Sequence, residues 1–181
     1  KMKEITISEI KTVAKEFGLA YSKVAAVKDI ESGGKGFDSV TQKIIIQFEP
    51  AWFRKKSPYT PSGKWSLNGV ERQLQEWIAF NDAFSKNANA AMESTSVGMM
   101  QVMGFHWKLL GFKNVGFMWD YAKVSEANQL RLGLKFIKSN KKMLNALISG
   151  DWKTFAYYYN GEKYYLLGYD KKLETAEKKY L

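Results

Sequence analysis

The chain lacks cysteine and has a single histidine, His106, among its 181 residues. The lack of cysteine excludes disulfides, thiol nucleophiles and cysteine–zinc sites. One histidine argues against a Ser-His-Asp triad and against a multi-histidine metal site. Acid–base chemistry would therefore fall to carboxylates, lysine or tyrosine, and we expect no metal and no cofactor.

Long apolar runs are also lacking. No run approaches the ~20 residues that cross a bilayer, and no apolar segment follows the N-terminal lysines as it would in a signal peptide. We therefore expect no membrane span and no secretion signal. The length, the 45% share of hydrophobic residues and the absence of any linker or repeat predict a single domain over residues 1–181.

Acidic residues are few, with 18 Asp and Glu against 28 Lys and Arg, so the formal net charge is +10. Such a charge attracts polyanions: nucleic acid, an anionic membrane surface or an anionic cell wall. The sequence has no RNP-like motif, zinc module or evident recognition helix, which disfavours nucleic acid as the partner. A non-catalytic module that binds the cell wall or nucleic acid remains an alternative to an enzyme.

Only three prolines are present, all between residues 50 and 69, where we predict an irregular loop. Thr6 and Glu9 form a predicted capping box before a helix that Gly18 ends. The β-branched segment 41–48 predicts a short strand or hairpin arm. An N-terminal cap is predicted at Asn68 and Glu71, before an apolar stripe of Val70, Leu74, Trp77 and Ile78. The predicted helices cover 22–31, 88–93, 105–110, 115–123, 126–139, 142–148, 152–159 and 170–180. The fold class is thus mainly α, with a small β element.

Glu31 is the most informative carboxylate of the sequence. It lies four residues after Val27 and seven after Val24, on the apolar face of its helix. It also ends that helix, where the helix dipole disfavours an anion. Burial and dipole together should raise its pKa from ~4.3 towards ~6. A glutamic acid still protonated near neutral pH could protonate the leaving oxygen in glycoside cleavage.

Two further segments carry polar side chains in apolar surroundings. Gln101 interrupts the apolar run 97–104, and a buried amide needs polar partners, which a sugar could supply. Asn160 ends a helix beside Tyr159, whose ring could offer a flat wall to a sugar. Each feature alone is also typical of an ordinary helix end or core position.

Four segments in order resemble the N-acetylmuramidase domain of bacteriophage endolysins, within the lysozyme-like superfamily of goose-type lysozymes and lytic transglycosylases. They span nearly the whole chain and read IESGGKGF (30–37), IQFEPAWF (46–53), AAMESTSVGMMQVMGFHW (90–107) and FAYYYNGEKYYLLGYDKKL (155–173). The chain departs from the pattern at Val97, where an aromatic residue is common, and at Met100, where Phe is common. Both changes are apolar and bear on the shape of a groove more than on chemistry.

The resemblance implies a lysozyme-like fold and cleavage of the β-1,4 bond between N-acetylmuramic acid and N-acetylglucosamine in bacterial peptidoglycan. Glu31 matches the family's catalytic glutamate. Gln101, Tyr159 and Asn160 match positions that line the saccharide groove in the superfamily. Glu49 and Glu93 also fall within the matching motifs, Glu49 as a candidate second catalytic residue and Glu93 as a candidate for substrate binding or for holding the backbone near Glu31.

We expect hydrolysis with Glu31 as the general acid, and the second group that takes part in the reaction stays open. A second carboxylate would lie about 6.5–9.5 Å from Glu31 in an inverting enzyme and about 5–5.5 Å in a retaining one. Glu49 is the better candidate, ahead of Asp38, which reads as a loop residue. Alternatively the substrate's own acetamido or 6-hydroxyl group attacks, the latter giving anhydro products as in lytic transglycosylases. We expect a monomer that is made in the host cytoplasm, acts on the cell wall and is drawn to anionic envelope polymers.

Overall fold

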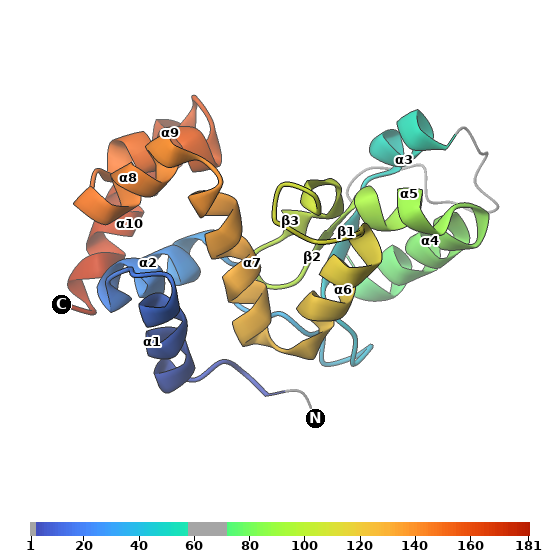
Figure 1. Ribbon diagram of the computed structural model, residues 1–181, viewed down its shortest axis with the longest axis horizontal. Helices are drawn as coiled ribbons and strands as arrows, with labels where there is room; N and C mark the ends of the chain where they lie inside the picture. Colours follow the sequence, from blue (N-terminus) through green and yellow to red (C-terminus); the bar gives the residue numbers. More distant parts are fainter. Residues whose placement is uncertain (1–2, 58–71) are drawn as a thin grey trace.

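The computed structural model describes residues 3–57 and 72–181, where short helices accompany a small antiparallel sheet (Figure 1). The α-helices are α1 (Ile7–Glu16), α2 (Tyr21–Glu31), α3 (Pro50–Lys56), α4 (Gln73–Lys86), α5 (Ala88–Glu93), α6 (Val115–Val124), α7 (Glu126–Lys138), α8 (Lys141–Ser149), α9 (Trp152–Asn160) and α10 (Tyr169–Lys178). Two 3-10 helices, η1 (Gly104–His106) and η2 (Tyr164–Leu166), complete the helical elements. The strands are β1 (Ile46–Phe48), β2 (Thr95–Val97) and β3 (Val102–Met103). The predicted mainly helical class with a small sheet is confirmed.

Helix α7 lies at the centre of the molecule (Figure 1). On one side of it are α1, α2, α8, α9 and α10, and on the other are the sheet and α3 to α6. The buried face of α7 carries Leu130, Leu134 and Ile137, each at most 1% exposed. One connected cluster of buried apolar side chains runs through both groups of elements, so α7 forms part of a core that they share.

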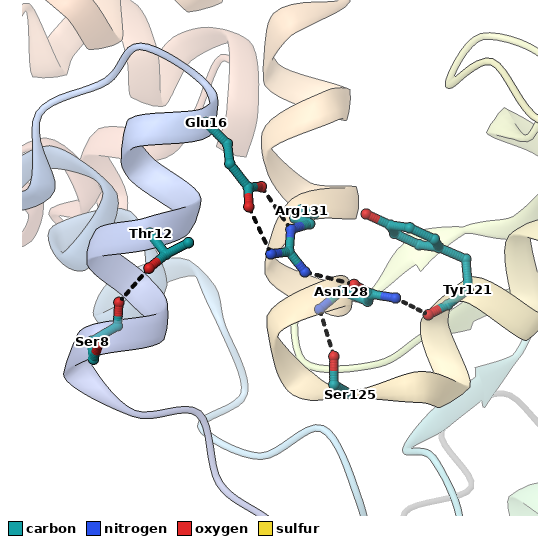
Figure 2. A network of polar contacts seen from close by, with 7 residues as sticks. All are labelled: Ser8, Thr12, Glu16, Tyr121, Ser125, Asn128 and Arg131. Atoms are coloured by element: carbon teal, nitrogen blue, oxygen red, sulfur yellow. Dashed lines mark hydrogen bonds and ion pairs between the residues drawn. The ribbon is translucent and has the colours of Figure 1, made fainter.

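A polar network also joins α1, α7 and α6 (Figure 2). Arg131 of α7 donates through Nε and Nη2 to the Glu16 carboxylate of α1, at 2.9 Å each. Its Nη1 donates to Asn128 Oδ1, and Asn128 Nδ2 donates to the Tyr121 carbonyl of α6. The network lies on the surface of the helix group and fixes α7 relative to its neighbours.

The predicted capping box before α1 is present, with the Thr6 hydroxyl accepting from the Glu9 N–H and the Glu9 carboxylate accepting from the Thr6 N–H. The polar–apolar alternation of β1 is also as expected for a half-buried strand: Ile46 and Phe48 are buried and Gln47 is exposed. Strand β1 is shorter than the predicted 41–48, where the earlier residues form a turn and a single bridge between Phe37 and Ile44.

Strands β2 and β3 lie between the predicted helices 88–93 and 105–110, where the sequence analysis predicts no strand. The order of the sheet is β1-β2-β3, antiparallel, with Ile46 opposite Val97 and Val97 opposite Val102. The turn between β2 and β3 needs two left-handed residues, Gly98 with φ +75° and Gln101 with φ +51°. A left-handed Gln is uncommon, so the residue type at position 101 does not indicate a turn.

Three other predictions around residues 50–110 are wrong. Residues 50–56 form α3 rather than a loop, because Pro50 sits in the first turn, where its missing N–H costs nothing. The predicted stripe on α4 is not its buried face, since Leu74 and Ile78 are 56% and 60% exposed, whereas Phe80 is buried. The predicted helix 105–110 is η1 followed by turns. The cap predicted at Asn68 and Glu71, with Val70, lies outside the described residues.

Candidate active site

Glu31 ends α2, on the face that buries Val24 and Val27 in the core. Its carboxylate is largely buried, and both of its oxygens accept hydrogen bonds from Asn160 Nδ2, at 3.1 and 2.7 Å. Burial raises the pKa of Glu31 to about 7, and the hydrogen bond from Asn160 opposes this rise by favouring the anion. The structure therefore places a carboxyl group that titrates near neutrality where the sequence predicts it.

Tyr159 and Asn160 approach Glu31 from the end of α9. The Tyr159 ring stacks on Phe155 with centroids 5.4 Å apart. Burial, and then the negative charge of Glu31, raise the pKa of the Tyr159 hydroxyl. Asn160 Oδ1 is buried and has no hydrogen-bond partner in the part of the chain that the structure describes. Asn160 Oδ1 is therefore a hydrogen-bond acceptor beside the Glu31 carboxyl group that none of the described residues satisfies.

The turn that contains Gln101 lies against the loop that follows Glu31. The Gly33 N–H donates to the Met99 carbonyl at 3.1 Å, and the Ile45 N–H donates to the Gly36 carbonyl at 2.9 Å. These two bonds join the loop after α2 to both the β2–β3 turn and the start of β1. The three predicted segments around Glu31, Gln101 and Asn160 therefore meet at one place.

The Gln101 amide is bonded mainly within the protein. Its Oε1 accepts from the Ser96 hydroxyl at 2.9 Å, and its Nε2 donates to the Gly98 carbonyl at 2.8 Å. A second, longer bond of 3.5 Å runs from Nε2 to the Ile45 carbonyl. These bonds hold the left-handed turn closed.

Two buried polar side chains of α7, missed in the sequence, support these loops. Glu126 accepts the Gly36 N–H at 2.7 Å and the Ile5 N–H at 2.8 Å. Gln129, 1% exposed, accepts the Met99 N–H at 2.8 Å and donates to the Ala122 carbonyl at 3.1 Å. The sequence indicates such a role, because Glu126 and Gln129 stand among apolar residues of the predicted helix 126–139. A polar side chain that is buried there must find hydrogen-bond partners.

Gly36 and Gly98 are required by this packing. A Cβ on Gly36 would lie 1.9 Å from Gln129 Oε1, and one on Gly98 would lie 2.7 Å from Gln129 Cγ. The backbone therefore approaches Gln129 so closely on both sides that no larger residue fits without a shift. Gln129 acts as a common support for the loop after Glu31 and for the β2–β3 turn.

Glu93, the last residue of α5, interacts with two other side chains of the protein. Its carboxylate accepts from Trp107 Nε1 at 3.1 Å and lies 3.7 Å from Lys56 Nζ. Asp38, the lesser candidate for a second carboxylate, accepts the Thr41 N–H at 2.7 Å and so closes its own turn. Both groups serve local structure in the described part of the chain.

Glu49 begins α3, where it is partly buried, and burial raises its pKa. It adjoins Glu76 of α4, a 3% exposed carboxyl that the sequence analysis missed. The pKa of Glu76 is raised to about 7, mainly by burial and further by the charge of Glu49, while a hydrogen bond from the Phe48 backbone opposes the rise. Glu49 is the fourth residue after Ile45, about 13 Å further along an extended chain. Ile45 is the residue at which the sheet meets the loop after Glu31.

The pKa of Glu31 carries no sign of a close carboxylate partner. Its pKa is set by burial and by Asn160, with no contribution from a second acid. A pair of carboxyl groups about 5–5.5 Å apart would each raise the pKa of the other. Within residues 3–57 and 72–181, no three His, Asp or Glu side chains gather as ligands of a metal ion would.

Comparison with known proteins agrees with this arrangement. A sequence model described as N-acetylmuramidase matches residues 20–181. The chain belongs to the N-acetylmuramidase family. The crystal structure of Burkholderia AP3 phage endolysin shares this muramidase fold with a TM-score of 0.87 and 32% sequence identity, over 99% of this chain and 73% of that chain.

The resemblance to endolysin muramidase domains, drawn from the four segments, is confirmed. The family match begins at residue 20, after α1, whereas the structural match includes α1. No curated protein matches the chain. None of the helices in the described residues has the length and apolar character that crossing a membrane requires.

Proposed function

We propose that this muramidase domain hydrolyses the β-1,4 bond between N-acetylmuramic acid and N-acetylglucosamine in bacterial peptidoglycan, and so lyses cells as an endolysin. The observation that carries the proposal is the largely buried Glu31, with a pKa of about 7. It sits where three segments distant in the sequence meet. The family match and the endolysin neighbour support peptidoglycan as the substrate.

Glu31 acts as the general acid in this proposal. Its proton passes to the glycosidic oxygen as the bond from that oxygen to C1 of muramic acid breaks, and water adds to C1. The departing proton leaves Glu31 as a carboxylate, which Asn160 Nδ2 stabilises through two hydrogen bonds. The site can therefore hold both protonation states that one turnover requires.

Asn160, Tyr159 and Gln101 are the proposed substrate contacts. The vacant, buried Oδ1 of Asn160 suits an N–H or O–H donor of the sugar, because an acceptor left without a partner costs free energy. Tyr159 precedes Asn160 at the end of α9, and its ring would border the sugar. Gln101 can accept one further hydrogen bond, and its main part is to shape the turn. We assign Glu93 a supporting part through its bonds to Trp107 and Lys56.

Glu49 is our candidate for the base that activates water. No second acid contributes to the raised pKa of Glu31, which disfavours a retaining pair of carboxylates. The same observation favours the alternative in which the 6-hydroxyl of muramic acid attacks C1 and an anhydro sugar forms, as in a lytic transglycosylase.

The variant Glu31→Gln tests the proposal. We expect its lytic activity on purified peptidoglycan to vanish while its circular dichroism and its binding to cell walls are kept. Unchanged lysis would rule out the assigned acid, and wall binding without any lysis by the wild type would favour a non-catalytic binding module. For Glu49, the variant Glu49→Ala should lose activity that added azide or formate restores, whereas full activity in this variant excludes it as the base.

The net charge of the domain indicates which cell-envelope polymers attract it. A domain with a net charge of +10 is drawn to the carboxylates of peptidoglycan stems and to phosphates of envelope polymers. We propose that it acts on the cell wall as a monomer after synthesis in the host cytoplasm, with neither a nucleic-acid partner nor a cofactor.

A further inference from the structure

A line of aromatic side chains leads away from Tyr159 across α7 to α3. Phe136 of α7 contacts Tyr159 with ring centroids 6.2 Å apart, and His106 of η1 contacts Phe136 at 5.0 Å. Phe105 contacts His106 at 4.3 Å, and Trp52 of α3 stacks on Phe105 at 4.9 Å with 30° between the ring planes. We call these five residues the aromatic band.

The aromatic band connects the two groups of elements on either side of α7. The elements that carry its residues can be found in Figure 1: α9 lies on one side of α7, with α2, and α3 lies on the other side. Trp52 is 41% exposed, and the other four rings are half-buried, with Phe136 and Tyr159 also packing against the core. The band therefore joins the core beside the Glu31 site to an aromatic ring at the surface, which a ligand can reach.

We propose that the aromatic band binds the glycan strand beyond the scissile bond, so that Trp52 forms a distal saccharide subsite. This inference rests on the proposed function, because the band begins at Tyr159, next to Glu31. A glycan strand is the occupant because the band is continuous with the site of cleavage and is longer than one sugar ring. The apolar C–H faces of sugars pack against aromatic rings, and a row of rings fits a linear polymer.

The charges near the band fit a strand that carries acidic stem peptides. Lys55 Nζ lies 4.8 Å from the centroid of the Trp52 ring, and Lys56 of the same helix lies beside Glu93. A cation–π contact at an exposed position is weak, so a sugar or a stem carboxylate can displace it. Burial lowers the pKa of His106 and so favours the neutral form of its ring, which suits stacking.

The experiment measures binding of uncrosslinked glycan strands of two and of eight sugars to the inactive variant Glu31→Gln. The double variant Glu31→Gln, Trp52→Ala should bind the long strand about tenfold more weakly, with binding of the disaccharide unchanged. Trp52→Phe in the same background should recover most of the affinity, since it restores a ring. Tyr157→Ala is the matched control, because Tyr157 is a 48% exposed aromatic residue of α9 outside the band.

Equal affinity for the long strand with and without the Trp52 ring would overturn the proposal, as would an equal loss in the Tyr157 control. A failure of the Glu31→Gln parent to bind long strands would overturn it too. Thermal unfolding of each variant separates lost binding from lost folding. If Glu31→Gln retained lysis, the proposed acid would be wrong, while the comparison of strand lengths would still decide the distal subsite.

Discussion

The buried carboxyl of Glu31 should destabilise the protein at the pH at which it is ionised. Its pKa rises from 4.5 to about 7 on folding, and at about 1.36 kcal/mol per unit this corresponds to roughly 3 kcal/mol. Because the folded state holds the proton more tightly than the unfolded state, stability falls as pH rises from about 4.5 to about 7. Below that window the cost is absent.

The variant Glu31→Gln removes this ionisation and keeps the shape of the side chain. It gives up one of the two hydrogen bonds from Asn160, a loss of about 1 kcal/mol. We therefore expect the variant to be more stable than the wild type by about 2 kcal/mol at pH 8, which is roughly 4–8 °C in Tm, and no more stable than the wild type at pH 4.

Urea unfolding of both proteins at pH 4 and pH 8 measures the effect. Glu76 titrates over the same range in both proteins, so only the difference between them reports on Glu31. A difference in unfolding free energy that is the same at the two pH values would refute the claim that Glu31 is held in a desolvated site.

Three further outcomes are expected. Asn160→Ala removes a bond that favours the Glu31 anion, so the alkaline limb of the pH–activity profile should move to higher pH; a limb that stays in place or moves down would contradict this. Gln129→Leu leaves the Met99 N–H buried without an acceptor, which should cost about 1–3 kcal/mol of stability and lower kcat. The control Asn128→Ala, on the same helix but in the network of Figure 2, should lose stability while its kcat is unchanged. Equal kcat values in the two variants would argue that Gln129 does not position the site. Lysis should decline as salt screens the net charge of +10, and activity that is flat with ionic strength would exclude electrostatic recruitment.

The helical part of the fold could be predicted from periodicity and capping residues. Thr6 and Glu9 specify the start of α1 by local hydrogen bonds, and Glu31 was placed on a buried face by its spacing from Val24 and Val27. These features depend on neighbours within one or two turns of the same helix, which the sequence displays directly.

The features that were missed depend on contacts between distant segments. The β2–β3 turn relies on Gln101 in a left-handed conformation, held by Ser96 and by backbone carbonyls that include Ile45. Glu126 and Gln129 are recognisable as supports only once Gly36 and Met99 lie beside them. A sequence can flag such polar residues as candidates for buried contacts, but their partners are set by the tertiary fold.

Mass spectrometry of peptidoglycan digested by the purified protein addresses the central claim most directly, with Glu31→Gln digested in parallel. The account predicts fragments with reducing muramic acid ends from the wild type and no fragments from the variant. Anhydro-muramic ends would contradict hydrolysis, and fragments from the variant at the wild-type rate would contradict the part assigned to Glu31.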